Sequence, residues 1–122
     1  MATTTTTSIS GIAATYYPVE DVERATSFWR DVMNLKLTAQ FDQGAEFELP
    51  DGSAFGLWKP TEEAFHASGW VMFSVPDIQA AVPHFRDRGV EIEGEIYDSP
   101  GCMMAFCRDT EGNQFMLHQS KT

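Results

Sequence analysis

Apolar residues recur at helical spacing in two places along the chain. The first stripe consists of Val22, Ala25, Phe28, Trp29 and Val32, and the second of Ile78, Ala81, Val82 and Phe85. Intervals of three and four residues predict two amphipathic helices. Asp21 and Asp77 each precede a stripe, where an N-cap acceptor belongs, and Gly89 suits the end of the second helix. Pro83 lies inside the second stripe and predicts a kink or a short first turn there.

Short apolar or alternating runs, bounded by turn residues, predict eight strands. They span residues 10–17, 36–41, 44–49, 53–58, 69–75, 90–97, 102–107 and 113–118. Gly52 and Gly112 lie in two predicted hairpin turns, because glycine adopts positive φ at little cost. Each half of the chain is therefore predicted to contain one strand, one helix and three more strands.

An internal repeat relates the two halves. The segment at residues 19–22 returns 56 residues later, and Asp51-Gly52 returns 60 residues later as Glu111-Gly112. The difference of four is an insertion within the second copy. These offsets predict a disordered tail at 1–8, two βαβββ modules at 9–59 and 69–119, and a linker at 60–68, with 9–119 forming one structural domain.

The charge of the chain restricts its partners. Among 122 residues there are 8 Lys and Arg against 18 Asp and Glu, a formal net charge of −10. An acidic surface of this kind repels phosphate backbones and attracts cations at long range, so we expect no nucleic-acid partner. No apolar stretch is long enough to cross a bilayer, so we expect no membrane partner either. Solubility alone is a sufficient reason for such acidity.

Two further features concern the compartment. Residues 1–8 form a threonine-rich run without the basic and apolar regions of a signal peptide, which favours the cytoplasm. Cys102 and Cys107 are five residues apart, so on one strand their side chains would point to opposite faces. That geometry disfavours a disulfide, and we expect two free thiols.

Three features together resemble the vicinal oxygen chelate superfamily, which includes glyoxalase I, extradiol dioxygenases, fosfomycin-resistance enzymes and bleomycin-resistance proteins. They are the paired βαβββ pattern, the Phe-Trp-Arg-Asp helix segment at 28–31, and Phe-Cys-Arg-Asp-Thr-Glu-Gly-Asn-Gln-Phe at 106–115. The resemblance covers about residues 9–119. It implies an α+β fold in which two mixed sheets curl into a cup, with the helices on the outer faces.

In the metal-dependent members of that superfamily, four strand residues hold a divalent ion inside the cup. The resemblance places these positions at Ala14, Gly56, Trp70 and Met116. The repeat offsets relate them in pairs, by 56 residues for the first strands and by 60 for the last. None of the four offers an imidazole or a carboxylate, the donors that such an ion needs. We therefore expect no metal and no cofactor at these positions.

Strand parity then identifies the remaining residues that face the cup. Alternate residues point to opposite sides, so Phe55, Phe73 and Phe115 would face the helices. The residues predicted to bind a ligand in the cup are Tyr16, Glu46, Trp58, Trp70, Met72, Met104, Phe106, Gln114, Met116 and His118. Aromatic rings and thioethers suit a small hydrophobic or aromatic molecule, and a carboxylate such as Glu46 suits a cationic group.

These residues favour metal-independent binding of a small molecule. The function is similar to that of the bleomycin-resistance branch, whose members are acidic dimers that hold a drug without transforming it. We also expect a homodimer, because one small chain would leave sheet edges and apolar surface in water.

Two other functions remain open from the sequence. A glyoxalase- or dioxygenase-like enzyme would use His118, Glu46 or Cys102, or a relocated metal site; Cys102 is the candidate nucleophile and His118 the candidate base. An interaction or regulatory protein would instead have its cup filled by its own apolar side chains: Trp58, Trp70 and Met116.

Overall fold

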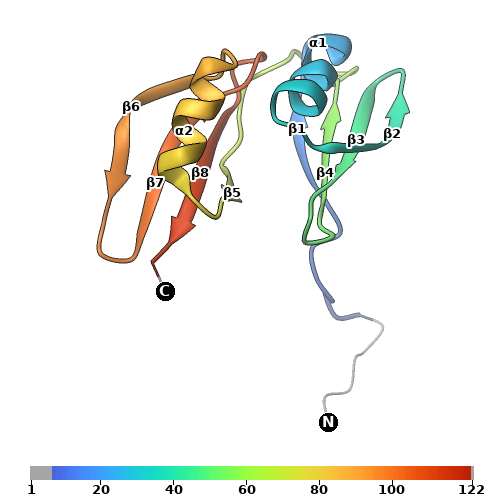
Figure 1. Cartoon of the computed structure of the whole chain (residues 1–122). Helices are drawn as coiled ribbons and strands as arrows, with labels where there is room; N and C mark the ends of the chain where they lie inside the picture. The colour runs from blue at the N-terminus through green and yellow to red at the C-terminus, as the bar shows by residue number, and fades with distance from the viewer. Residues whose placement is uncertain (1–6, 122) are drawn as a thin grey trace.

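The computed structural model describes residues 7–121, so most of the tail predicted at 1–8 lies outside the described residues. Two four-stranded sheets, each with its own helix, make up the fold (Figure 1). The elements are β1 (Thr15–Pro18), α1 (Val22–Ser27), a π-helical turn η1 (Phe28–Val32), β2 (Lys36–Phe41), β3 (Gly44–Glu48), β4 (Ala54–Trp58), β5 (Val71–Ser74), α2 (Ile78–Asp87), β6 (Glu91–Asp98), β7 (Cys102–Arg108) and β8 (Gln114–Ser120).

Both sheets have the same topology. The strand orders are β1-β4-β3-β2 and β5-β8-β7-β6, with the first pair of each parallel and the other pairs antiparallel. Tyr16 pairs with Gly56 in the first sheet, and Met72 pairs with Met116 in the second, which reproduces both repeat offsets. The predicted α+β fold of two βαβββ modules is therefore confirmed. In Figure 1, β1 and β5 form the inner edges of the two sheets.

The helix termini agree with the sequence, but the helix interiors differ from it. Asp21 accepts a hydrogen bond from the Arg24 amide at 3.0 Å, and Asp77 caps α2 in the same way. The first helix changes to a π-helical turn at Phe28, which the apolar spacing does not predict. The second helix continues through Pro83, because its buried residues pack on the second sheet. The predicted short first turn is therefore wrong, and the alternative of a kink at Pro83 stays a prediction. Neither helix is long and apolar enough to cross a membrane, as judged over residues 7–121.

The helix-facing sides of the two sheets meet around Trp29. This side chain is only 1% exposed, and its ring centroid lies 4.8 Å from Phe55, 5.4 Å from Phe73 and 4.9 Å from Phe115. Phe55 belongs to the first sheet and the other two belong to the second. All three phenylalanines are buried, which confirms the predicted parity. Since both apolar sides converge here, the opposite faces of the sheets point away from the shared core.

A polar network joins the start of α1 to the turn before β8. Asn113 is fully buried; its amide nitrogen donates to the Pro18 carbonyl at 2.7 Å, and its amide oxygen accepts from the Ser68 N–H at 2.8 Å. The buried Glu111 carboxylate accepts from Arg24 Nε at 2.7 Å and from two backbone N–H groups that precede α1. Both side chains thus satisfy backbone groups of the other module.

Tyr17 completes this network from the opposite direction. Its hydroxyl donates to the Gln114 carbonyl at 2.6 Å and accepts from the Val71 N–H at 3.0 Å. Burial raises the pKa of Tyr17 to about 12, so the phenol remains protonated and can donate. We call the contacts of Tyr17, Arg24, Glu111 and Asn113 the locked junction.

The carboxylate of Glu111 makes the locked junction sensitive to acid. Burial by itself raises the pKa of Glu111, but hydrogen bonds from Arg24, Asp21, Thr110 and Glu20 together outweigh it and lower the pKa to about 2. A folded-state pKa below the unfolded value of 4.5 means that this stabilisation is present above about pH 4.5 and is lost as the pH falls toward 2. Asp109 acts in the opposite direction, since burial raises its pKa.

We therefore expect Glu111→Gln to lower the free energy of unfolding by about 2 kcal/mol near neutral pH, because it removes the charge that binds Arg24. The difference from the unmodified protein should shrink as the pH falls below about 4.5. Denaturant unfolding across the acid range measures it. A difference that stays constant with pH would show that the ionised carboxylate is not the source of the stabilisation.

Candidate functional site

The outward face of the first sheet carries an aromatic and acidic cluster. The ring of Tyr16 lies over Gly56, so that a Cβ added at this glycine would be 2.3 Å from a ring carbon. The Tyr16 hydroxyl donates to a Glu46 carboxylate oxygen at 3.1 Å. Partial burial and Glu46 both raise the pKa of Tyr16, which keeps the donor protonated. Trp58 lies beside them on the same face and is 46% exposed. We call this the first open face.

A hollow of about 350 Å³ adjoins the first open face, where the segment after β4 passes back over the sheet. Tyr16 and Trp58 line it from the strands, while Glu63 and His66 line it from the connecting segment. Sequence reasoning assigned no role to either connecting residue. No local signal marks them, because their position depends on the path of an irregular segment and not on strand periodicity.

The outward face of the second sheet is rich in sulfur and aromatic groups. Trp70 is 70% exposed and Met72 is 53% exposed, whereas Met116 is covered by its neighbours at 1%. Strand pairing places Met116 between Met72 on β5 and Phe106 on β7. The remaining predicted members of this face are partly buried: Met104, Gln114 and His118. We call this the second open face.

The three candidate catalytic residues do not meet within one chain. Glu46 belongs to the first open face, whereas His118 and Cys102 lie on the second sheet. The Cys102 sulfur lies 3.7 Å from the Ser99 hydroxyl, and strand pairing places Cys102 opposite Ser120. Met104 is opposite His118, so Cys102 and His118 are diagonal neighbours on adjacent strands, while the hydrogen bonds that the described residues give Cys102 go to Ser99 and not to His118.

Both cysteines are free thiols, as predicted. Cys107 lies on the helix-facing side and is buried, and burial raises its pKa to about 11. A raised pKa suppresses the thiolate and makes Cys107 a packing residue.

The four positions at which the resemblance places metal ligands carry no side chain that suits a divalent ion. Ala14 precedes β1, Gly56 is covered by a tyrosine ring, and Trp70 and Met116 offer an indole and a thioether. Within residues 7–121, no group of three or more His, Cys, Asp and Glu side chains is placed to hold a metal. Hard and borderline cations need oxygen or imidazole donors, which these positions lack.

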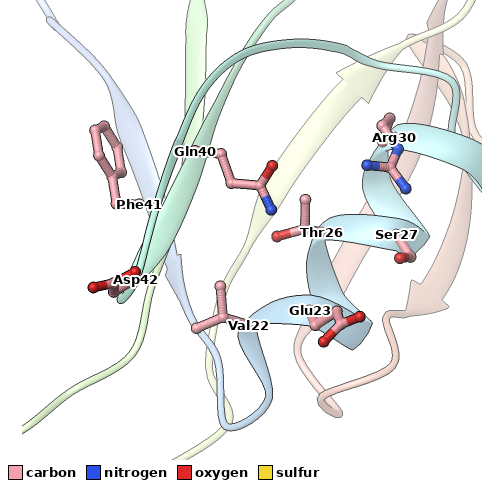
Figure 2. A pocket seen from close by; sticks show the side chains of 8 residues that line it. All are labelled: Val22, Glu23, Thr26, Ser27, Arg30, Gln40, Phe41 and Asp42. Atoms are coloured by element: carbon pink, nitrogen blue, oxygen red, sulfur yellow. The ribbon is translucent and has the colours of Figure 1, made fainter.

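A separate hollow of about 320 Å³ lies on the helix side of the first sheet, between α1 and the end of β2 (Figure 2). Gln40 extends its amide toward Thr26, and Arg30 lies at the far side. The Thr26 hydroxyl is buried without a hydrogen-bond partner. Arg30 is already paired with Asp31 at 2.8 Å, and the other charged groups that line the hollow are the carboxylates of Glu23 and Asp42.

Comparisons with known proteins agree with this architecture. The family model described as the glyoxalase/bleomycin resistance protein/dioxygenase superfamily matches residues 11–117. No curated protein matches the sequence.

Solved structures share the fold at low sequence identity. Lactoylglutathione lyase from Agrobacterium tumefaciens has a TM-score of 0.78 at 20% identity, covering 91% of this chain and 94% of that one. TnmS3, an antibiotic binding protein from a Streptomyces species, has a TM-score of 0.75 at 24% identity, covering 93% and 98%. A superfamily member from Sphaerobacter thermophilus has a TM-score of 0.79 at 22% identity, covering 91% and 98%. These structures show the same fold, and the family match over residues 11–117 shows that the chain belongs to the glyoxalase/bleomycin resistance protein/dioxygenase superfamily.

Proposed function

We propose that the protein binds a small hydrophobic or aromatic molecule, neutral or cationic, without a metal ion. The observation that carries this proposal is the Tyr16 ring over Gly56, hydrogen-bonded to Glu46. Gly56, where the resemblance places a metal ligand, is here covered by a ring. The fold likeness to an antibiotic binding protein supports the same conclusion.

The exposed side chains of the open faces suit such a ligand. Trp58 and Trp70 present ring surface on which a planar molecule can stack, and the methionine side chains adapt to its shape. Glu46 is hydrogen-bonded to Tyr16 and supplies a carboxylate on the same face as Trp58. The net charge of −10 attracts a cation toward the site at long range.

We further propose that two copies of the chain close the site. The two open faces point away from the shared core, so neither encloses a ligand by itself. In a homodimer, the first open face of one chain would meet the second open face of the other. Light scattering should then give twice the mass of the 122-residue chain.

Titration with a planar aromatic cation tests the binding function. Proflavine should quench the fluorescence of the protein, since Trp58 and Trp70 are exposed and the third tryptophan is buried in the core. We expect Trp58→Ala and Trp70→Ala each to weaken binding about tenfold, through lost stacking and desolvation. Calorimetric titration of the same variants measures the affinity without relying on fluorescence.

Removal of the Glu46 charge and removal of metal ions are the controls for the proposed binding. Glu46→Gln should weaken proflavine binding about threefold and leave a neutral ligand of similar shape unaffected. Binding should persist after treatment with a chelator. Failure of both tryptophan variants to alter the affinity, or binding that requires an added divalent ion, would contradict the proposal. Conversion of a ligand that depends on His118 would favour the enzyme instead.

A further inference from the structure

The internal repeat predicts a second junction that mirrors the locked junction. The turn at 49–53 corresponds to the turn at 109–113 with an offset of 60, and the two turns share the same backbone hydrogen bonds. The start of α2 corresponds to the start of α1 with an offset of 56. If the side chains were also repeated, the turn at 49–53 would bind residues 74–80 as the turn at 109–113 binds residues 18–24.

Every side chain that closes the locked junction is replaced at the mirrored one. Phe73 occupies the position that corresponds to Tyr17 and has no hydroxyl. Ala80 occupies the position that corresponds to Arg24 and has no charge. Asp51 occupies the position of Glu111, and Ser53 that of Asn113, and both have shorter side chains than their counterparts. They bond to each other, with the Ser53 hydroxyl donating to Asp51 at 2.6 Å. These two polar groups therefore interact within their own turn and not with the other module.

A cavity of about 680 Å³ lies at the mirrored junction. Its lining includes the counterparts of the locking residues, Asp51, Ser53 and Phe73, together with apolar groups such as Leu49, Val71 and Pro76. This volume is in the range of ligand pockets, and most of the lining is apolar with a few polar groups at fixed places. Residues of β1, β4 and β5 line the cavity, and none of its lining residues is shared with the hollow that adjoins the first open face.

We infer that this cavity is a second binding site, for an uncharged, largely apolar molecule of one or two rings that carries a hydroxyl group. The apolar lining provides the surface that such rings would bury. At the locked junction, the Tyr17 hydroxyl bridges the Val71 N–H and the Gln114 carbonyl. The repeat offsets relate Val71 to Thr15 and Gln114 to Ala54, and both of these counterparts line the cavity. A ligand hydroxyl would supply the group that Phe73 lacks.

The charge of the cavity excludes anions. None of its lining residues is Lys, Arg or His, and the exposed Asp51 is one of them. Hydrogen bonds from Ser53 lower the pKa of Asp51, so this carboxylate stays ionised at neutral pH. A carboxylate-bearing ligand would therefore meet a like charge with no cation to offset it.

Titration with 2-naphthol, followed in methyl NMR spectra, tests the site. We expect the methyl signals of Leu49 and Val71 to shift with saturation at one naphthol per chain, while 2-naphthoate leaves them unchanged. Phe73→Tyr should weaken naphthol binding about tenfold, because the new hydroxyl takes the place of the ligand hydroxyl. Phe41→Tyr is the matched control, because it adds the same hydroxyl to an exposed phenylalanine on β2 that does not line the cavity; this variant should bind naphthol as the unmodified protein does.

A second variant reproduces the contacts of the locked junction, in case Phe73→Tyr alone perturbs the core. Phe73→Tyr, Asp51→Glu, Ser53→Asn and Ala80→Arg together copy the locked junction, so the combined variant should lose naphthol binding and unfold at a higher temperature. Absence of naphthol binding would overturn the inference, as would naphthol binding that neither variant weakens. Shifts confined to Met104, on the second open face, would also overturn it while leaving the proposed function intact.

The same variant separates a ligand from a second chain. If it reverts the protein to a monomer in the absence of naphthol, the cavity is a contact between copies and the inference is wrong. If the mass is unchanged and only naphthol binding is lost, the cavity is a ligand site.

Discussion

Asn113→Ala is expected to lower the free energy of unfolding by about 3 kcal/mol, because at a fully buried position it removes one hydrogen bond to the other module and one to the linker. The Pro18 carbonyl and the Ser68 N–H would both lose their partner. The bond from the Asn113 side chain to Asp109 would also be lost, in a turn where that carboxylate is already buried. Urea unfolding followed by circular dichroism measures the change.

The repeat supplies a matched control for this substitution. Ser53 occupies the corresponding place in the first module, is exposed, and bonds only within its own turn. Ser53→Ala should therefore cost no more than about 0.5 kcal/mol. Equal losses for the two variants would mean that position in the turn, and not the contact between modules, determines the stability.

Trp29→Ala is expected to have the largest effect on stability, about 4–5 kcal/mol, since it leaves a cavity where the two sheets meet. The ring contacts aromatic side chains of both sheets, and its loss would uncouple them. We expect thermal unfolding to lose its single cooperative transition, because the modules would then unfold at different temperatures. Calorimetry distinguishes one transition from two.

Trp29→Phe distinguishes the ring from the indole nitrogen. The indole N–H is buried without a hydrogen-bond partner, and phenylalanine removes this cost while keeping an aromatic ring. We expect a loss of about 1 kcal/mol or less. Trp58→Ala, at a half-exposed position on the first open face, should likewise change stability little. A loss for Trp29→Phe as large as that for Trp29→Ala would show that the indole nitrogen has a role that the contacts do not reveal.

The strands and helix termini could be predicted because they depend on neighbouring residues. Alternation along the strands placed Phe55 and Phe73 on the helix-facing side, and both are buried. The caps at Asp21 and Asp77 follow from side-chain geometry within one turn. The π-helical turn at Phe28–Val32 was not predicted, because apolar spacing alone does not distinguish it from an α-helix.

The candidate site was predicted only in part. Parity placed Tyr16, Trp58, Trp70 and Met72 together in one cup, whereas within one chain they are exposed on two separate sheet faces. It did not predict that the Tyr16 ring covers the neighbouring strand, nor that a connecting segment brings Glu63 and His66 beside it. Side-chain rotamers and the paths of irregular segments depend on tertiary contacts, and the periodicity of the sequence does not predict those contacts.

The sequence by itself therefore determined the repeat, the two βαβββ modules and the side of each strand that faces the core, because these follow from local periodicity. Only the tertiary structure decided how the modules meet. Asn113 contacts Pro18 across 95 residues, and Tyr17 contacts Gln114 across 97. Contacts of that range depend on how two finished modules dock, and the same docking leaves one junction locked and its mirror open.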